Sequence, residues 1–291
     1  MDDIFIRIRR FYARGNVLTR LIFINVAVFL AVRLALVGAM LFRVEGGGFL
    51  RYLQMPSSPG EFICQPWSAL TYMFLHVDFI HILFNMLCLY WFGRIFLQFF
   101  SARHLGGIYV LGGIAGGLLF MLSYNVFPYF REVHFSLLMG ASASVMGIVF
   151  AVAFYRKNYE ISLLFIGRVK LVYLALFALL MDLLSVTSAN AGGHIAHIGG
   201  ALFGILFAMQ FQRGRDLTVF VNRMIDRLVN LTRRKPRMKV TVNRPETDME
   251  YNARRQEEMK ALDAILDKLK RSGYESLSAD EKRRLFDASR K

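Results

Sequence analysis

Residues 18–42 read LTRLIFINVAVFLAVRLALVGAMLF, and Arg20 and Arg33 are the only charges in this run of 25 residues. A helix rises about 1.5 Å per residue, so about 20 apolar residues cross the roughly 30 Å hydrocarbon core of a bilayer. The stretch therefore predicts a membrane-spanning helix. It is too long for the apolar part of a cleavable signal peptide and lacks a small-residue cleavage site, so no such signal is expected.

The composition of the whole chain supports a membrane protein. Hydrophobic residues make up 55% of the 291 residues and charged residues 20%, and the mean hydropathy is +0.40. These values exclude a disordered protein and a collagen-like fibre. Cys64 and Cys88 are the only cysteines; we expect them to be structural and unpaired, which excludes a disulfide scaffold. The net charge of +15 lies beside apolar segments, so it favours a membrane-lipid partner and no nucleic acid.

Six apolar runs are long enough to be spans, and they predict an all-α membrane protein with a six-helix bundle. The fifth run is short, and Ile161–Ile166 could extend it if Arg168 and Lys170 lie at the headgroups. The six predicted spans are Leu18–Phe42, Ile80–Phe100, Gly106–Tyr124, Leu138–Tyr155, Leu171–Val186 and His194–Phe211.

The connections between the runs alternate between basic and weakly basic. The N-terminal arm, residues 93–105, residues 156–170 and everything after Phe211 are rich in Arg and Lys, whereas the other three connections are not. Positive connections stay on the cytoplasmic side. We therefore predict a multi-pass protein of the cell membrane, the inner membrane in a Gram-negative cell, with both termini in the cytoplasm.

Composition divides the chain into four parts. A cytoplasmic arm (1–17) precedes the six-span core (18–211), and a segment with a net charge of +8 follows (212–245). That segment is either an amphipathic helix on the anionic inner leaflet or a solvated basic linker. Residues 246–291 carry eleven basic and eleven acidic residues. A helix that stops at Ser272–Gly273, followed by the capping box Ser278–Glu281, predicts a small cytoplasmic helical hairpin, for which we expect an interaction role with a cytoplasmic protein partner.

Polar side chains gather at the outer ends of three predicted spans. His81 and Asn85 lie one turn apart on the second, Ser142 is on the fourth, and His194 and His197 begin the sixth. A serine with a histidine base can attack a peptide carbonyl, because the imidazole accepts the hydroxyl proton and later gives it to the leaving amine. A backbone N–H at a helix start, with His81 and Asn85, would stabilise the anionic intermediate.

Small residues spaced four apart would let these helices approach closely. The pairs are Gly112/Gly116, Gly113/Gly117 and Gly200/Gly204. Such pairs permit close helix contact in membranes, although the pattern is common in transmembrane helices and weak alone. A serine and a histidine on separate helices need contact of this kind.

Three motifs in this order resemble the signatures of rhomboid intramembrane serine proteases. They are His81-Ile-Leu-Phe-Asn85, Gly140-Ala-Ser142-Ala and Ala196-His197-Ile-Gly199-Gly200, and the resemblance covers roughly Thr19 to Phe211. It implies a serine endopeptidase with Ser142 as nucleophile and His197 as base, a dyad without an acidic third member. It further implies an oxyanion hole from the Ser142 N–H, His81 and Asn85, single-span membrane proteins as substrates, and neither cofactor nor metal. The tail also looks like a small C-terminal domain of unknown role that some bacterial rhomboids carry.

The chain departs from the family pattern at three places. Ala143 replaces the usual glycine after the serine, Met146 replaces an aromatic residue that stacks on the histidine, and Trp67–Ser68 replaces a Trp-Arg pair in the first loop. None of the three removes a reacting group. Ala143 leaves room for the alternative of a catalytically silent rhomboid-like protein that binds membrane proteins; a channel or transporter is a third, weaker hypothesis because charged relay residues and an inverted repeat are missing.

The remaining polar residues receive structural interpretations. Asp182 is expected at the membrane interface, and His76 at the end of the outer loop. His194 is expected to be an interfacial residue or a cap neighbour rather than a second base. His194-x-x-His197 spacing alone suggests a metal, but no carboxylate accompanies the pair in the sequence, so none is expected. For Arg33 three possibilities stay open: snorkelling, pairing with a carboxylate, or contact with lipid headgroups.

Overall fold

The computed structural model describes residues 15–44, 48–132, 135–163, 166–232 and 247–288. The chain forms two compact units, Met1–Arg233 and Arg234–Lys291. The predictions for the N-terminal arm before residue 15 and for the basic residues 233–246 lie outside the described residues.

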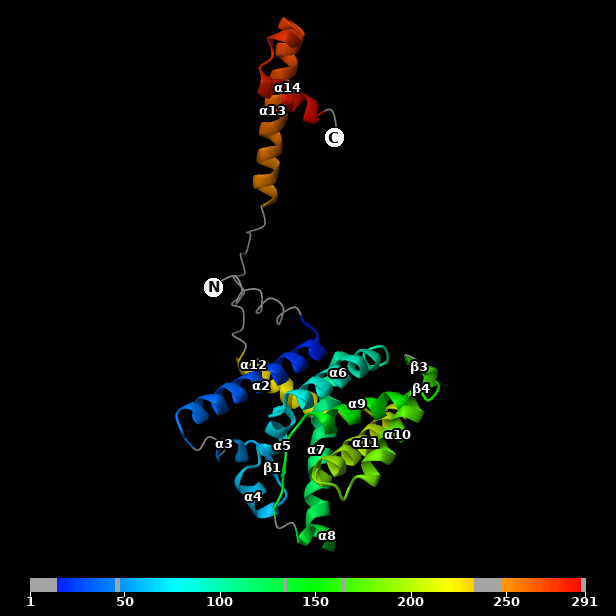
Figure 1. Ribbon diagram of the computed structural model, residues 1–291. Helices are drawn as coiled ribbons and strands as arrows, with labels where there is room; N and C mark the ends of the chain where they lie inside the picture. The colour runs from blue at the N-terminus through cyan, green and yellow to red at the C-terminus, as the bar shows by residue number, and fades with distance from the viewer. Residues whose placement is uncertain (1–14, 45–47, 133–134, 164–165, 233–246, 289–291) are drawn as a thin grey trace. The chain divides into compact units, whose positions relative to one another are not determined.

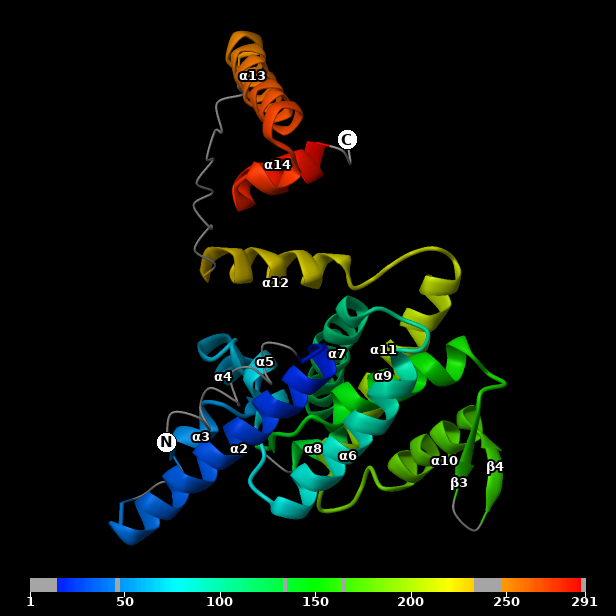
Figure 2. The same cartoon turned by 90° about the horizontal axis from the view of Figure 1, so that it is seen from above.

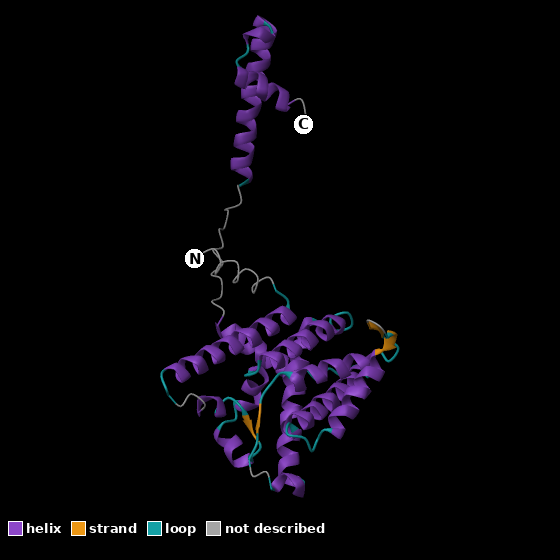
Figure 3. Ribbon diagram, viewed as in Figure 1, coloured by secondary structure: helices purple, strands orange, loops and turns teal. Residues whose placement is uncertain are grey.

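The first unit is a bundle of apolar helices (Figures 1 and 3). Four of them are long and apolar enough to cross a membrane, and two shorter apolar helices lie among them. All six predicted spans are therefore helical. Their bounds are α2 Val17–Leu41, α6 Phe79–Phe96, α7 Ala102–Val126, α9 Ser142–Tyr155, α10 Leu171–Leu184 and α11 Ala191–Gln212.

The helix α9 is the centre of this bundle. It packs against α6, α7, α10 and α11, and ten of its residues between Ala143 and Ala153 are buried. A helix that is hydrophobic all round is stable only where neighbours surround it. The bundle therefore surrounds the helix that carries Ser142.

Short elements fill the connections. The loop between α2 and α6 contains α3 Gly48–Arg51, β1 Met55–Pro56, α4 Pro59–Cys64, α5 Ser68–Thr71 and the 3₁₀ turn η1 Tyr72–Phe74. α8 Pro128–Arg131 and β2 Leu137–Leu138 lie between α7 and α9. β1 and β2 are antiparallel, with Met55 opposite Leu138.

Two predicted boundaries were wrong because local capping was overlooked. The second span ends at Phe96 rather than Phe100, and α7 begins at Ala102 rather than Gly106. Ser101 is the N-cap of α7: its hydroxyl accepts the His104 N–H, and the His104 ring accepts the Ser101 N–H. This reciprocal pair satisfies two backbone donors and starts the helix one turn earlier.

The proposed extension of the fifth span was also wrong. Residues 160–163 and 167–170 form an antiparallel pair, β3 Glu160–Leu163 and β4 Gly167–Lys170, with Ser162 opposite Arg168. Gly167 has a φ of +88°, a left-handed conformation that glycine adopts without steric cost. The chain reverses there, so α10 spans only Leu171–Leu184.

The end of the first unit is helical as well. α12 Val219–Thr232 follows α11 after a loop, as Figure 2 shows in yellow. It covers residues 219–232 of the predicted basic segment 212–245, and its side chains Phe220 and Met224 are exposed. The helix is thus confirmed, whereas its place on a leaflet stays a prediction.

The second unit is the predicted helical hairpin. It consists of α13 Asp248–Ser272, the turn η2 Tyr274–Ser276 and α14 Ala279–Ala288, and Ile265 and Leu277 are its buried side chains in the described residues. Gly273 has a φ of +78° where α13 stops. The Ser278 N–H and the Lys268 ammonium both bind Glu281 and hold the pKa of that carboxyl below its usual range.

Candidate active site

Ser142 is the first residue of α9, and the backbone before it has a shape that requires glycine. Gly140 has a φ of +121°, which residues with a Cβ rarely adopt. β2 pairs with β1 up to Leu138, and the chain then turns through Gly140 into the helix. α9 therefore begins at Ser142 rather than at Leu138 as predicted. At this position the Ser142 N–H has no carbonyl one turn earlier within the helix to accept it.

Two polar groups hold this turn in place. The Gly140 N–H donates to the Tyr72 carbonyl oxygen at 2.9 Å, and the Ala141 N–H donates to His76 Nε2 at 3.3 Å. His76 has no exposed surface, and burial, with His81 acting in the same direction, lowers the pKa of His76 to about 4. The imidazole is therefore neutral near pH 7 and can accept a hydrogen bond. The prediction placed His76 at the end of the outer loop. The structure shows a further role, because His76 supports the turn at Gly140 and Ala141 that precedes Ser142, the nucleophile turn.

His81 approaches this turn from α6. Asp78 is the N-cap of α6, and its carboxylate accepts the His81 N–H at 2.7 Å. A Cβ placed on Gly140 would lie 2.8 Å from His81 Cε1 and 3.9 Å from Ser142 Oγ. Gly140 thus leaves the space that the His81 ring occupies beside Ser142. The structure brings these two predicted site residues together.

Asn85 follows His81 by one turn on the same helix. It is buried, and its Nδ2 donates to the His81 carbonyl oxygen at 3.0 Å. An amide nitrogen has two N–H donors, so this bond leaves one of them for another acceptor.

The helix α11, which carries His197, touches the backbone of α9. A Cβ on Gly200 would overlap the Ala143 carbonyl oxygen, and one on Gly204 would overlap the Gly147 carbonyl oxygen. These two glycines confirm that the small-residue pairs lie at helix contacts, where the absence of side chains permits a close approach. The contact brings the His197 helix against the residue that follows Ser142.

Ala143, the first departure from the family pattern, has a matching space on α7. A Cβ on Gly116 would lie 2.6 Å from the Ala143 methyl group and 2.6 Å from the Ala196 carbonyl oxygen. Gly116 therefore accommodates the methyl group that Ala143 adds, and the helices stay close. Met146, the second departure, is partly buried and packs against the core.

Asp182, predicted near the outer end of the fifth span at the membrane interface, is buried within the bundle. It is 8% exposed on α10, and its Oδ1 lies 2.8 Å from His194 Nδ1 and 2.9 Å from His197 Nδ1. A carboxylate thus accompanies the histidine pair in space although none does so in sequence. His194, predicted to be an interfacial residue or a cap neighbour, lies in the first turn of α11 and is partly buried, with its side chain 24% exposed.

The arrangement of Asp182, His194 and His197 is close enough to hold a metal ion. One ligand atom from each residue lies within 4.8 Å of the others. Each histidine nitrogen also fits a hydrogen-bond donor to the carboxylate. A lone acidic residue in an apolar segment is the signal that could have revealed this pairing, because a charge at bilayer depth requires a partner.

The contact between the two residues of the predicted dyad, Ser142 and His197, is not a hydrogen bond in the described part of the chain. Catalytic hydrogen bonds are often long in enzymes without substrate and tighten in the complex. His197 Nε2 makes no hydrogen bond in the described part of the chain, and Nδ1 is bound to Asp182.

Three further sequence expectations have structural outcomes. The Trp67 indole donates to the Tyr52 carbonyl oxygen at 2.8 Å, so the first loop is anchored without the arginine of the family pattern. Arg33 donates to the Val77 carbonyl oxygen at 3.3 Å, an alternative to the three that the sequence left open. Cys64 and Cys88 are free, as predicted.

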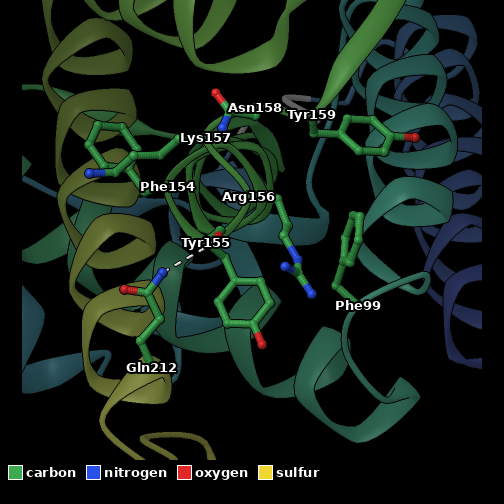
Figure 4. A pocket seen from close by; sticks show the side chains of 8 residues that line it. All are labelled: Phe99, Phe154, Tyr155, Arg156, Lys157, Asn158, Tyr159 and Gln212. Atoms are coloured by element: carbon green, nitrogen blue, oxygen red, sulfur yellow. Dashed lines mark hydrogen bonds between the residues drawn. The ribbon is translucent and has the colours of Figure 1, made fainter.

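A cavity of about 540 Å³ lies at the opposite end of α9 from Ser142 (Figure 4). Tyr155, Arg156 and Lys157 line it where α9 ends, and Gln212 Nε2 donates to the Tyr155 carbonyl oxygen at 3.3 Å. The 14 residues of α9 correspond to about 20 Å of helix. The cavity is therefore separate from Ser142.

Comparisons with known proteins show two family matches along the chain. Residues 64–213 match the family model described as the Rhomboid domain, and residues 246–291 match a family of unknown function (DUF6576). RHOMBOID-like protein 12, mitochondrial, from Arabidopsis thaliana is 26% identical over 158 residues, 51% of this chain and 47% of that protein. Rhomboid-related protein 1 from Caenorhabditis elegans is 31% identical over 163 residues, 52% of this chain and 43% of that protein. The chain thus spans about half the length of the curated relatives it matches.

Proposed function

The chain belongs to the rhomboid family, since the Rhomboid domain model matches more than half of it, and on that premise we propose that it is an intramembrane serine endopeptidase. The observation that carries the proposal is the position of Ser142 at the start of the central helix. His81 lies beside it, and the helix of His197 is in backbone contact with the next residue, Ala143. A serine on a helix surface would lack these neighbours.

The chemistry follows the acyl-transfer scheme of serine proteases. Ser142 Oγ attacks the carbonyl carbon of the scissile bond while His197 Nε2 takes the hydroxyl proton. The tetrahedral intermediate collapses, the C–N bond breaks, and the imidazolium gives its proton to the leaving amine. Water then attacks the acyl-enzyme with His197 again as base, and the free acid and Ser142 are regenerated.

The negative charge of the intermediate requires donors near Ser142. The Ser142 N–H lies at the positive end of the α9 dipole and is unsatisfied within the helix. His81 is beside it, and Asn85 has a second N–H on the next turn. Together they are suited to an oxyanion hole, and each such donor contributes about 10²- to 10³-fold to the rate in serine proteases.

The substrates proposed are single-span membrane proteins that are cut near the outer end of their helix. Hydrolysis requires water, which enters a membrane protein only where polar groups open a path from one face. Ser142, His81 and His197 lie at one end of their helices, and the basic connections assign the other end to the cytoplasm. The proposal therefore includes cytoplasmic termini and cleavage on the outer side.

The test uses the full-length protein in detergent and in liposomes. A fluorophosphonate probe and a fluorescent single-span substrate are offered to the wild type, Ser142→Ala and His197→Ala. We expect labelling and cleavage in the wild type, and loss of both by about 10³-fold or more in either variant, because the reacting groups act as a unit. Thermal unfolding of each variant shows whether it is folded.

A different outcome would favour the alternative function. If the folded wild type captures single-span proteins but neither labels nor cleaves them, and if Ser142→Ala captures them equally well, the protein is a catalytically silent binding module. In that case the Ala143→Gly and Met146→Phe variants, which restore the family pattern, would show whether those two positions cause the silence.

A further inference from the structure

Asp182 is a polar group with an unusual position. α10 attaches to the bundle through three buried residues in its described length, Leu171, Ala175 and Asp182, and the rest of the helix is more exposed. These residues are separated by four and seven positions, so they lie on one face of the helix. A carboxylate on the attached face of an apolar helix is costly unless it is hydrogen-bonded.

Its partners are both imidazoles of α11. Asp182 Oδ1 accepts from Nδ1 of His194 at 2.8 Å and from Nδ1 of His197 at 2.9 Å. The two rings are 6.0 Å apart and nearly perpendicular, at 81°. Both distances are in the range of charge-assisted hydrogen bonds.

This contact determines which nitrogen of His197 carries the proton. A carboxylate oxygen only accepts, so the proton of the neutral imidazole is on Nδ1 and the lone pair is on Nε2. Nε2 is the atom that must take the Ser142 proton in the proposed function. When it does so, the positive ring lies 2.9 Å from a carboxylate oxygen, which stabilises the charge.

We propose that Asp182 is the positioning residue of a Ser142–His197–Asp182 triad. It selects the tautomer of His197, holds the orientation of the ring and stabilises the imidazolium, and the second bond from His194 fixes the carboxylate. The inference rests on the proposed function. It also differs from the two-residue mechanism that the family resemblance implied.

The titratable groups that face His197 come from three helices. Asp182 lies on α10, His194 on the same helix as His197, and His81 on α6. α9 contributes the Ser142 hydroxyl. Asp182 is the one carboxylate among these named groups, so its removal changes the charge around the base without removing a reacting atom.

The experiment measures kcat and KM of the full-length protein in liposomes from about pH 5 to about pH 9. Asp182→Asn keeps the shape and removes the charge. We expect kcat to fall by about 10²-fold or more with KM changed less than about twofold. We also expect the acid limb of the kcat/KM profile to move to lower pH, because no anion then favours the protonated ring.

Asp182→Glu and Asp216→Asn are the matched variants. Glutamate restores the charge and is expected to return the acid limb toward its wild-type position even if kcat recovers only partly. Asp216 follows the opposite end of α11, and its carboxylate contacts His104 at 3.2 Å. Asp216→Asn therefore removes a second carboxylate–histidine contact and is expected to leave kcat and the pH profile within about twofold of wild type.

Three outcomes would overturn the proposal. One is an Asp182→Asn protein with wild-type kcat and pH profile while Ser142→Ala is inactive; that result leaves the proposed function intact. A second is a loss of thermal stability and kcat with an unmoved acid limb, which assigns Asp182 to helix attachment alone. The third is loss of wild-type activity with a chelator and its return with Zn²⁺, which makes the three residues a metal site. Unchanged cleavage in Ser142→Ala would instead overturn the proposed function.

Discussion

At the scale of single residues, the nucleophile turn depends on one glycine and one histidine. Gly140 has a φ of +121° and leaves the space for the His81 ring. His76 accepts the Ala141 N–H only while its Nε2 is unprotonated. The hydrogen bond that holds the backbone before Ser142 therefore requires a neutral His76 imidazole. The position of Ser142 depends on pH for this reason.

The stability of the protein is expected to fall in acid through His76. Burial lowers the pKa of His76 from 6.5 to about 4, so the unfolded chain binds the proton first as the pH falls. The stabilisation is complete above pH 6.5 and is lost between pH 6.5 and pH 4, by about 3 kcal/mol in total. Thermal unfolding of the wild type and His76→Gln across this range measures the effect.

His76→Gln is the matched variant because its amide oxygen can accept the Ala141 N–H but does not titrate in this range. We expect its unfolding temperature to fall less than that of the wild type between pH 7 and pH 4.5. Parallel curves for the two proteins would show that His76 is protonated equally in the folded and unfolded states.

At the scale of elements, the contact between α9 and α11 decides whether Ser142 and His197 can meet. Gly147, Gly200 and Gly204 bring the two backbones together. Helices in a bilayer gain little from hydrophobicity when they associate, so close van der Waals packing supplies much of the attraction. Side-chain volume added at this contact therefore affects both the stability of the bundle and the distance between Ser142 and His197.

Gly200→Ala is expected to destabilise the bundle by about 1–3 kcal/mol, because its methyl group would overlap the Ala143 carbonyl oxygen and force α11 away from α9. The rate of fluorophosphonate labelling is expected to fall with it. Gly38→Ala is the control: it lies within α2, and a Cβ there meets nothing within 4 Å. Equal unfolding temperatures and labelling rates in the two variants would contradict this role of the contact.

At the scale of the whole molecule, each of the two units buries apolar side chains of its own. The core and the residues packed on it lie between Val17 and Leu217, whereas the hairpin buries Ile265 and Leu277 within its own unit. A role in recruiting a cytoplasmic protein stays our proposal for the hairpin.

Deletion of residues 246–291 tests that role. We expect the unfolding temperature of the core and the labelling of Ser142 to stay at wild-type values, because the hydrophobic core is unchanged. Turnover of a membrane substrate, or capture of a cytoplasmic partner, is expected to change. Unchanged turnover together with unchanged capture would remove the proposed role of the hairpin.

Local properties of the chain determined much of this protein from sequence alone. Apolar length predicted all six helices, since hydrocarbon thickness sets the length of a span. The end of α13 at Gly273 and the capping box of Ser278 were also predicted from the sequence, because each depends on residues within one helical turn. The motif residues His81 and Ser142 were correctly expected to lie together.

Only the tertiary structure decided the partners of the polar groups. The pairing of Asp182 with His194 and His197 depends on the rotation of α10 and α11 about their axes. The start of α9 depends on β2 pairing with a strand more than 80 residues earlier. Helix rotation and strand pairing result from many weak contacts between distant segments, whereas hydrophobicity and capping act within one segment. The sequence therefore determined which helices form, and packing determined which side chains meet.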